Sequence, residues 1–234
     1  MKYISTLTAK AVCCAAIAIG LSLPGRVQAA TSAFVYQFTD VFQGSAPEGT
    51  PPWISTAFSD ISPGVVQMTI TAEGMTTAES LSSLLLNLNP TDNPKNLSFS
   101  YVSSTGSFTH PTVTTGENQF KADGDGKYDI DLSFSDKTSK IFSTGDSITI
   151  DITSSTPGLD ALDFDALSKP SAGGAGPFLA AAEFQCTTTP SITEWVAPVA
   201  LTPVPEPGTI GIFAAGATLL AAAKWRKSRS ARAS

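Results

Sequence analysis

Alternation of apolar and polar residues with a period of two is the feature that most limits how this chain can fold. Such alternation is typical of strands with one buried and one solvated face. Further strands are expected over residues 53–58, 84–88 and 178–186. Together these segments predict an all-β domain, a β-sandwich or jelly roll. The alternating apolar sets are Phe34/Tyr36/Phe38, Val66/Met68/Ile70, Phe99/Tyr101, Ile130/Leu132/Phe134 and Ile148/Ile150/Ile152.

Turn and linker signals divide the strands from one another. Pro63-Gly64 and Pro157-Gly158 are typical of turns between strands. Residues 159–167 predict one short helix, with Leu159, Leu162 and Ala166 on its inner face. The Thr- and Pro-rich residues 187–203 predict an extended linker, so the folded domain is expected over residues 30–186.

The start of the chain has the order of a secretory signal peptide. Lys2 and Lys10 form a basic region, and an apolar run over residues 11–23 follows. Val27-Gln28-Ala29 places small residues three and one before a cleavage point, so residues 1–29 are expected to be removed on export.

Three parts follow one another at the end of the chain. Residues 204–209 have the sequence Val-Pro-Glu-Pro-Gly-Thr, and proline keeps the residue before it out of the helical region, which predicts an accessible extended peptide. Residues 208–223 form an apolar run that predicts a short transmembrane helix, about 24 Å long at about 1.5 Å per residue. A basic tail then predicts a cytoplasmic stop-transfer signal made of Lys224, Arg226, Lys227 and Arg229.

These parts, in this order, resemble the PEP-CTERM sorting signal of Gram-negative bacteria. The resemblance covers residues 204–229 and rests on Val204, Pro205, Glu206, Pro207, Gly208, Thr209, the apolar helix and the basic tail. It implies that a membrane enzyme, the exosortase, recognises the signal and cuts near Pro-Glu-Pro. It also implies release or transfer to the cell surface, often in strains that make exopolysaccharide. Residues 51–53, 121–130 and 144–150 resemble the extracellular domain of many such proteins, which has no assigned activity.

The charge of the exported part excludes some classes of partner. Residues 30–203 hold six lysines, no arginine and nineteen Asp and Glu, for a formal charge of −13. Such a domain repels phosphate backbones and anionic lipid surfaces, so a nucleic-acid partner is not expected. Cys186 is the single cysteine after residue 29, so no disulfide within the domain is expected.

The turn Asp123-Gly124-Asp125-Gly126-Lys127-Tyr128-Asp129 leaves two interpretations open. Alternating carboxylates can bind a hard cation, which makes Asp123, Asp125 and Asp129 calcium candidates. However, Lys127 and Tyr128 stand at the fifth and sixth positions, where an EF-hand loop needs an oxygen ligand and glycine. The other interpretation is a tight Asp-Gly turn that leads into a strand, with no cofactor.

Other chemistry-bearing residues are sparse. Asp160, Asp163 and Asp165 could pair as acid and base, but their spacing fits a solvated helix face better. His110 lacks a nucleophile motif nearby, and no Gly-x-Ser-x-Gly occurs. Stacking on sugars by Trp53, Tyr101 and Tyr128 requires that they share one exposed face.

We therefore expect a non-enzymatic protein of the cell surface or exopolysaccharide matrix, with a structural or adhesive role. Its expected partners are an exosortase, the membrane before processing and, after it, extracellular polysaccharide. The precursor is expected in the inner membrane and the product at the surface or in the medium. Two alternatives stay open: a carbohydrate-binding module of the matrix, and an extracellular glycan hydrolase.

Overall fold

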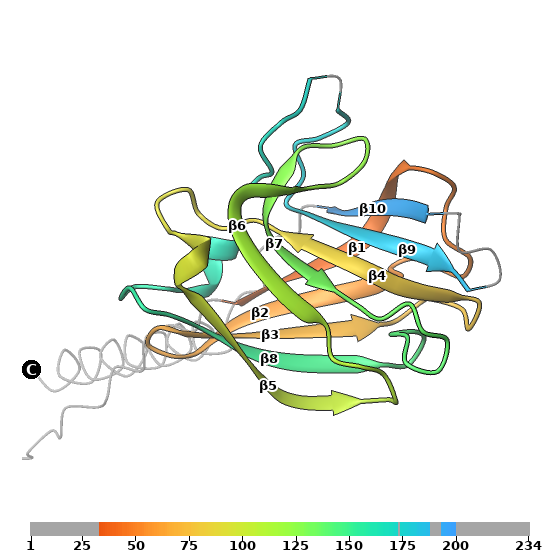
Figure 1. Cartoon of the computed structure of the whole chain (residues 1–234), viewed down its shortest axis with the longest axis horizontal. Coiled ribbons are helices and arrows are strands. Elements are labelled where there is room, and N and C mark those ends of the chain that lie inside the picture. The colour runs from red at the N-terminus through yellow and green to blue at the C-terminus, as the bar shows by residue number, and fades with distance from the viewer. Residues whose placement is uncertain (1–32, 173, 188–192, 200–234) are drawn as a thin grey trace, which may run out of the picture.

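The described part of the chain is all-β, as predicted. A computed structural model describes residues 33–172, 174–187 and 193–199 (Figure 1). Within them the chain forms ten strands and two short 3-10 helices, η1 (Pro94–Asn96) and η2 (Ala161–Phe164). The strands are β1 (Ala33–Gln43), β2 (Ile54–Ser62), β3 (Val65–Ala72), β4 (Glu79–Leu86), β5 (Leu97–Thr105), β6 (Thr112–Lys121), β7 (Lys127–Ser133), β8 (Ser147–Ser154), β9 (Ala180–Cys186) and β10 (Thr193–Val199).

The ten strands of the described residues form one antiparallel sheet, whereas a sandwich has two separate sheets. The strand order is β5-β8-β3-β2-β1-β10-β9-β4-β7-β6. The sheet doubles over, and buried side chains from both of its halves form one core. We call β5, β8, β3 and β2 with the start of β1 the first half, and β10, β9, β4, β7 and β6 the second half. The architecture is thus sandwich-like, built from a continuous sheet.

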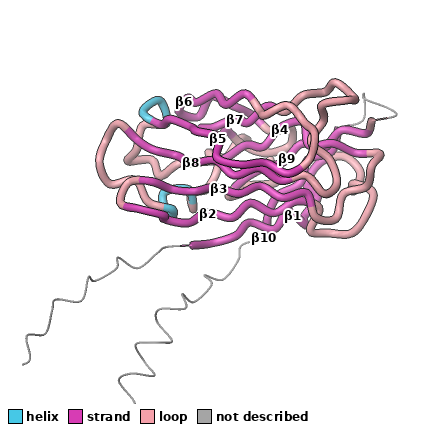
Figure 2. Tube along the Cα trace, turned by 90° about the horizontal axis from the view of Figure 1, so that it is seen from below, coloured by secondary structure: helices cyan, strands magenta, loops and turns pink. Residues whose placement is uncertain are grey.

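Strand β1 is the corner between the two halves. Its first part, Ala33–Phe38, pairs with β2, and its second part, from Gln37 to Gln43, pairs with β10. Two register shifts interrupt the second ladder, after Phe38 and after Val41. Because bulges bend and twist a strand, they let β1 leave one layer and enter the other. Figure 2 shows β10 beside β1 at one side of the molecule.

The main core lies between the halves and is rich in aromatic rings. Phe58 stacks on Phe34 with ring centroids 4.9 Å apart, and on Phe164 of η2 at 5.1 Å. Leu84 of β4 and Phe184 of β9 enter the same cluster from the second half. Removal of this apolar area from water is the main stabilising term of the fold.

A second, smaller cluster covers the outer face of the second half. It contains Leu85, Ala122, Tyr128, Ala181 and Trp195, with Phe42 and Phe120 packed against it. Strands β4, β9 and β10 are therefore buried on both faces over much of their length, whereas β3 and β8 alternate between buried and half-buried residues.

Strand β10 corrects the predicted linker. Residues 193–199 lie in the range 187–203 assigned to an extended linker, but they pair with both β1 and β9. Strand β10 contains Pro198, although proline donates no ladder hydrogen bond and is rare in central strands. Pro198 sits opposite Phe38, beside a register shift in β1, where the ladder is already irregular. Strand β6 was also missed, whereas each of the other strands overlaps a predicted segment.

The predicted helix is shorter than expected, and a different face of it is buried. Only Ala161–Phe164 is helical, and Ala161 and Phe164 are buried, while Leu162 is 55% exposed. Asp160 and Asp163 form a capping box, in which each side chain accepts a hydrogen bond from backbone N–H of the helix start.

The expected signal peptide (1–29), the transmembrane run (208–223), residues 204–209 and the basic tail all lie outside the described residues. Among the residues that are described, no helix has the length and apolar character needed to cross a membrane.

Candidate functional site

Asp125, a calcium candidate, points into the protein. It is 2% exposed, and its Oδ2 accepts hydrogen bonds from the Tyr128 hydroxyl (2.5 Å) and the Ser168 hydroxyl (2.8 Å). Burial, and to a smaller extent the hydrogen bond to Asp125, raises the pKa of Tyr128. Its hydroxyl therefore stays protonated and acts as a donor. Gly176 packs against the other carboxylate oxygen, Oδ1, so closely that a Cβ at this position would lie 1.7 Å from it. Asp125 thus joins the 122–126 turn to the loop that precedes β9.

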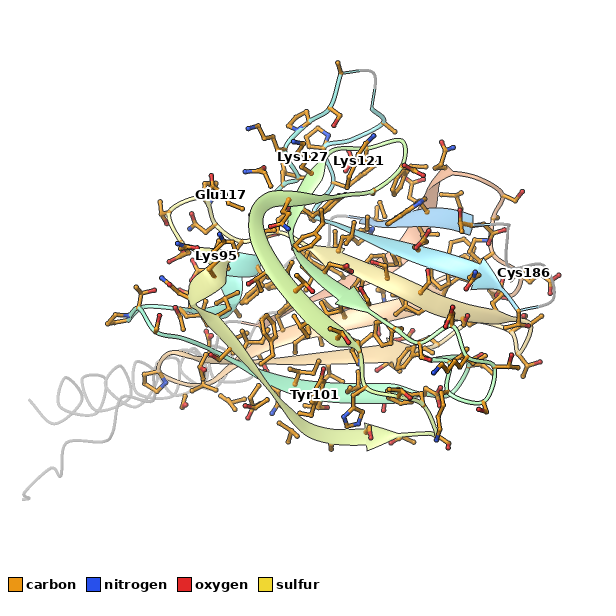
Figure 3. All side chains as sticks on the ribbon, viewed as in Figure 1. Lys95, Tyr101, Glu117, Lys121, Lys127 and Cys186 are labelled. Carbon is orange, nitrogen blue, oxygen red and sulfur yellow. The ribbon has the colours of Figure 1, made fainter. Side chains whose placement is uncertain are left out.

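The other two calcium candidates have separate positions. Asp129 accepts from the backbone N–H of Asn118 at 2.7 Å and of Leu88 at 3.1 Å, and Asp123 is exposed. In the described ranges no group of three or more His, Cys, Asp or Glu side chains is placed to hold a metal. The geometry therefore gives the calcium interpretation no support. It agrees with a tight turn, which has Gly124 at φ +84° and a bond from the Asp125 N–H to the Ala122 carbonyl. Figure 3 shows Lys121 and Lys127 where this hairpin enters and leaves its turn.

The three aromatic residues considered for sugar stacking share no exposed face. Trp53 and Tyr128 are 5% and 0% exposed, so their rings belong to the interior. Tyr101 is 40% exposed, but its hydroxyl donates to the Pro111 carbonyl and its ring lies 4.5 Å from that of His110. These contacts join β5 to the start of β6.

The remaining sequence candidates have structural contacts. His110 lies in an exposed loop, with its Nε2 3.4 Å from the Ser104 hydroxyl. Asp160 and Asp163 cap η2. Burial raises the pKa of Asp163, and the hydrogen bond from the Asp160 N–H opposes this shift. Asp165 lies 3.5 Å from the Tyr36 hydroxyl. Cys186 is the half-buried last residue of β9 (Figure 3).

A groove that the sequence did not reveal lies on the outer face of the second half. Its volume is about 470 Å³. Strand register explains its central row, because Ser133, Ser83, Glu183 and Trp195 are successive cross-strand partners on β7, β4, β9 and β10. The full lining is Ser82, Ser83, Leu85, Gln119, Phe120, Lys121, Asp131, Ser133, Glu183 and Trp195.

Serine hydroxyls hold both carboxylates of the groove. Ser82 donates to Glu183 at 2.9 Å, and Ser83 and Ser133 donate to Asp131 at 2.7 and 2.8 Å. Burial is the main cause of a raised pKa for Glu183. The hydrogen bond from Ser82 opposes this shift, whereas the charges of Asp123 and Asp131 add to it. The groove therefore combines hydroxyl, amide, ammonium and carboxylate groups with two aromatic residues.

The two carboxylates of the groove lie on strands that flank β4. Asp131 lies opposite Leu85 and Glu183 opposite Ser83, which puts them two strands and two residues apart. With strands about 4.8 Å apart and a rise of about 3.3 Å per residue, their Cα atoms are about 12 Å apart.

The predicted sorting signal is found by comparison with protein families. The model described as the PEP-CTERM protein-sorting motif matches residues 203–229. The chain carries a PEP-CTERM sorting motif. The match agrees with the predicted bounds of 204–229 to within one residue. It includes Pro205, Glu206 and Pro207 and the whole basic tail from Lys224 to Arg229, and it does not extend to the β-domain.

Comparisons of the whole chain add little to the PEP-CTERM assignment. No curated protein matches the chain. One similar solved structure is a biomass-sensing module from Rsgi-like proteins of Clostridium thermocellum, described as resembling a family 3 carbohydrate-binding module of the cellulosome. It has 10% sequence identity and a TM-score of 0.33, over 73% of this chain and 99% of that one. A likeness this weak carries no argument about the activity of this domain.

Proposed function

We propose that this chain is an exported structural or adhesive protein of the cell surface or exopolysaccharide matrix, sorted by an exosortase. The observation that carries the proposal is the sorting motif at residues 203–229. The signal-peptide pattern over residues 1–29 and the charge of −13 on residues 30–203 fit an exported, soluble domain.

In the proposed sorting step, Pro205, Glu206 and Pro207 present an extended peptide to the exosortase. Residues 208–223 hold that peptide at the membrane, and the basic tail keeps the C-terminus on the cytoplasmic side. The product then leaves the inner membrane for the surface or the medium.

A non-enzymatic role agrees with what the carboxylates do. Asp125, Asp129 and the capping pair of η2 bond to groups of the fold itself. Those of the groove accept hydrogen bonds from serine hydroxyls of neighbouring strands. The proposal therefore includes neither a catalytic residue nor a cofactor.

The mass of the intact protein from the cell surface and the medium tests the sorting step. We expect a species that begins near Ala30 and ends close to Pro205-Glu206-Pro207, and an added mass would indicate covalent attachment. Alanine at Pro205, Glu206 and Pro207 should leave the uncut form in the membrane. The matched control replaces Leu201 and Thr202 with alanine and should be processed normally. A wild-type product that still ends at Ser234 would contradict the proposal.

Glycan binding at the outer groove is the second candidate function. It is favoured by one specific observation, the placement of Gln119, Lys121 and two carboxylates around Phe120 and Trp195. Amide, ammonium and carboxylate groups are able to hydrogen-bond sugar hydroxyls, and the acidic domain favours a neutral glycan over an anionic one.

A pull-down with neutral and acidic polysaccharides tests this candidate. We expect retention on a neutral polysaccharide, at least tenfold weaker after Gln119→Ala and Lys121→Ala. The matched control, Gln67→Ala with Thr149→Ala on the outer face of the first half, should bind as the wild type does. Equal retention of both variants would exclude the groove, and no retention of the wild type would exclude the candidate.

A further inference from the structure

In the described part of the chain the sheet has two edge strands, β5 and β6. Strand β5 pairs with β8 on one side, and no described strand pairs with its other side. Nearly all of its nine residues are exposed, Val102 at 53% and Tyr101 at 40%. An edge of this kind presents a row of backbone N–H and C=O groups that can pair with another strand.

The β6 edge carries the features that usually prevent such pairing. Its ladder to β7 is interrupted between Thr115 and Phe120, and Asn118 in this interruption has φ +49°. Glu117 and Lys121 place charges on the strand, and η1 packs beside it. Figure 3 shows Glu117 on β6 and Tyr101 on β5. Bulges and charges are the common means of blocking an edge.

Strand β5 has a single register shift, at Val102, and lacks the charges of β6, although Tyr101 and Ser104 contact His110 and Pro111 of the following loop. Residues 97–105 contain no proline or glycine, and residues 96–116 contain no Asp, Glu, Lys or Arg. In a domain with a formal charge of −13, this is an uncharged segment where two copies can approach with little repulsion.

The side chains of β5 are also complementary to themselves. Ser98, Ser100 and Ser103 are exposed, and a hydroxyl both donates and accepts hydrogen bonds. Opposed serines across an antiparallel pair can therefore bond to one another, and Tyr101 and Val102 add apolar contact. A second copy of this chain presents the same hydroxyl and apolar groups, so the pairing needs no other partner.

We propose that β5 is an association edge at which a second copy of this chain adds its own β5, antiparallel and about a two-fold axis. The sheet then continues through both molecules, and the interface is isologous. A nine-residue edge buries little area, so the contact is weak in dilute solution and gains from dense display on a surface. This contact between copies goes beyond the proposed structural role and does not depend on the sorting step.

Sedimentation velocity on the exported protein, purified over a concentration series, tests the proposal. We expect a concentration-dependent dimer for the wild type. Ser100→Lys with Val102→Lys puts charges of one sign at the paired edge and should weaken dimerisation at least tenfold. The control, Thr112→Lys with Thr114→Lys on β6, should dimerise as the wild type does. A wild type that stays monomeric, or equal effects of the two double variants, would overturn the proposal.

Cysteine scanning gives a second measurement that does not depend on the lysine variants. Single cysteines at Ser98, Ser100, Ser103, Ser104 and Thr105, in a Cys186→Ala background, are oxidised and the covalent dimer is measured. Paired antiparallel strands bring Cα atoms to about 4.5–5.5 Å, within the reach of a disulfide. Cross-linking should therefore peak at one position near the two-fold axis and fall on either side. Uniform or absent cross-linking would contradict antiparallel pairing, and the C-terminal mass of the same samples reports separately on sorting.

Discussion

The two halves of the sheet share one core but differ on their outer faces. In the first half the outer face is polar, where Gln67 bonds to Asp151 at 3.0 Å and the hydroxyls of Thr69 and Thr149 lie 3.2 Å apart. In the second half the outer face is covered by the cluster around Leu85, Tyr128 and Trp195. The same chain thus contains one layer with a single buried face and one in which β4, β9 and β10 are buried on both faces over much of their length.

The additional layer of the second half depends on polar groups that position its loops. Asp125 joins Tyr128 to Ser168, and Ser168 in turn accepts the backbone N–H of Phe178 at 3.0 Å. These bonds hold the loop before β9 against the hairpin between β6 and β7. The difference between the halves therefore depends on a few buried contacts, and substitutions can test it.

The largest effect is expected for Leu85→Ala. Leu85 is 3% exposed in the outer cluster, so the cavity and the lost apolar burial should lower the free energy of unfolding by about 2–4 kcal/mol. The matched position in the first half is Thr69, where alanine should cost less than about 1 kcal/mol because only one exchangeable hydroxyl contact is lost. Urea unfolding of both variants measures the difference, and similar midpoints would mean that the outer cluster adds no stability.

Asp125→Ala should have the next largest effect. It leaves two buried hydroxyl donors, those of Tyr128 and Ser168, without their acceptor, which should cost about 1–3 kcal/mol. Asp123→Ala, at an exposed position in the same turn, should stay within about 0.5 kcal/mol of the wild type. Addition of calcium should not change the unfolding midpoint of the wild type. A large shift with calcium would restore the metal interpretation of this turn.

A smaller effect is expected at the end of the first half, where η2 covers the core. Asp160→Ala removes the N-cap of this helix, which should cost about 1 kcal/mol. The contact of the Tyr36 hydroxyl with the Phe164 carbonyl, 2.8 Å in the wild type, should loosen with it. Hydrogen exchange at β1 and β2 provides the measurement, and unchanged exchange there would show that η2 is not needed to cover the core.

The smallest effect concerns pH. Burial raises the pKa values of Glu79, Glu183 and Glu194, all on strands of the second half. Between the ordinary carboxyl pKa and these raised values the folded state binds more protons than the unfolded state. Stability therefore falls as pH rises through that window and is recovered as pH falls.

Unfolding by urea between pH 7 and the ordinary carboxyl range checks the predicted pH dependence. Glu183→Gln with Glu194→Gln should flatten the dependence, because neither side chain then titrates. Replacement of Asp136, an exposed acidic residue, with asparagine makes the net charge less negative without removing a buried carboxyl and serves as the control. An equal slope in the wild type and the double variant would show that general charge repulsion, and not burial, causes the pH dependence.

The first half could be predicted well from the sequence because its strands have one buried face and one face toward the solvent. The sets Val66/Met68/Ile70 and Ile148/Ile150/Ile152 all lie in the core. Alternation fails for β10, whose Trp195 and Val196 are buried on opposite faces. The single bent sheet also escaped prediction, because the bulges of β1 leave no local pattern.

The candidate site could be predicted only in part. The sorting motif is a continuous peptide, so its residues were identified directly from the sequence and the family comparison confirms it. The groove brings together Gln119, Asp131, Glu183 and Trp195 from four strands, and only the register of the sheet places them side by side. Asp125 looked like a cation ligand because the sequence does not show which carboxylate of a turn points inward.

The position of β10 determines how the protein bears a mechanical load. This strand ends at Val199, and residues 200–202 separate it from the sorting motif. A pull on the C-terminal end reaches a strand with ladders to β1 on one flank and β9 on the other. Detachment must break two rows of hydrogen bonds, whereas an edge strand would peel away after breaking one. Tethering at this end would therefore direct force through the middle of the sheet.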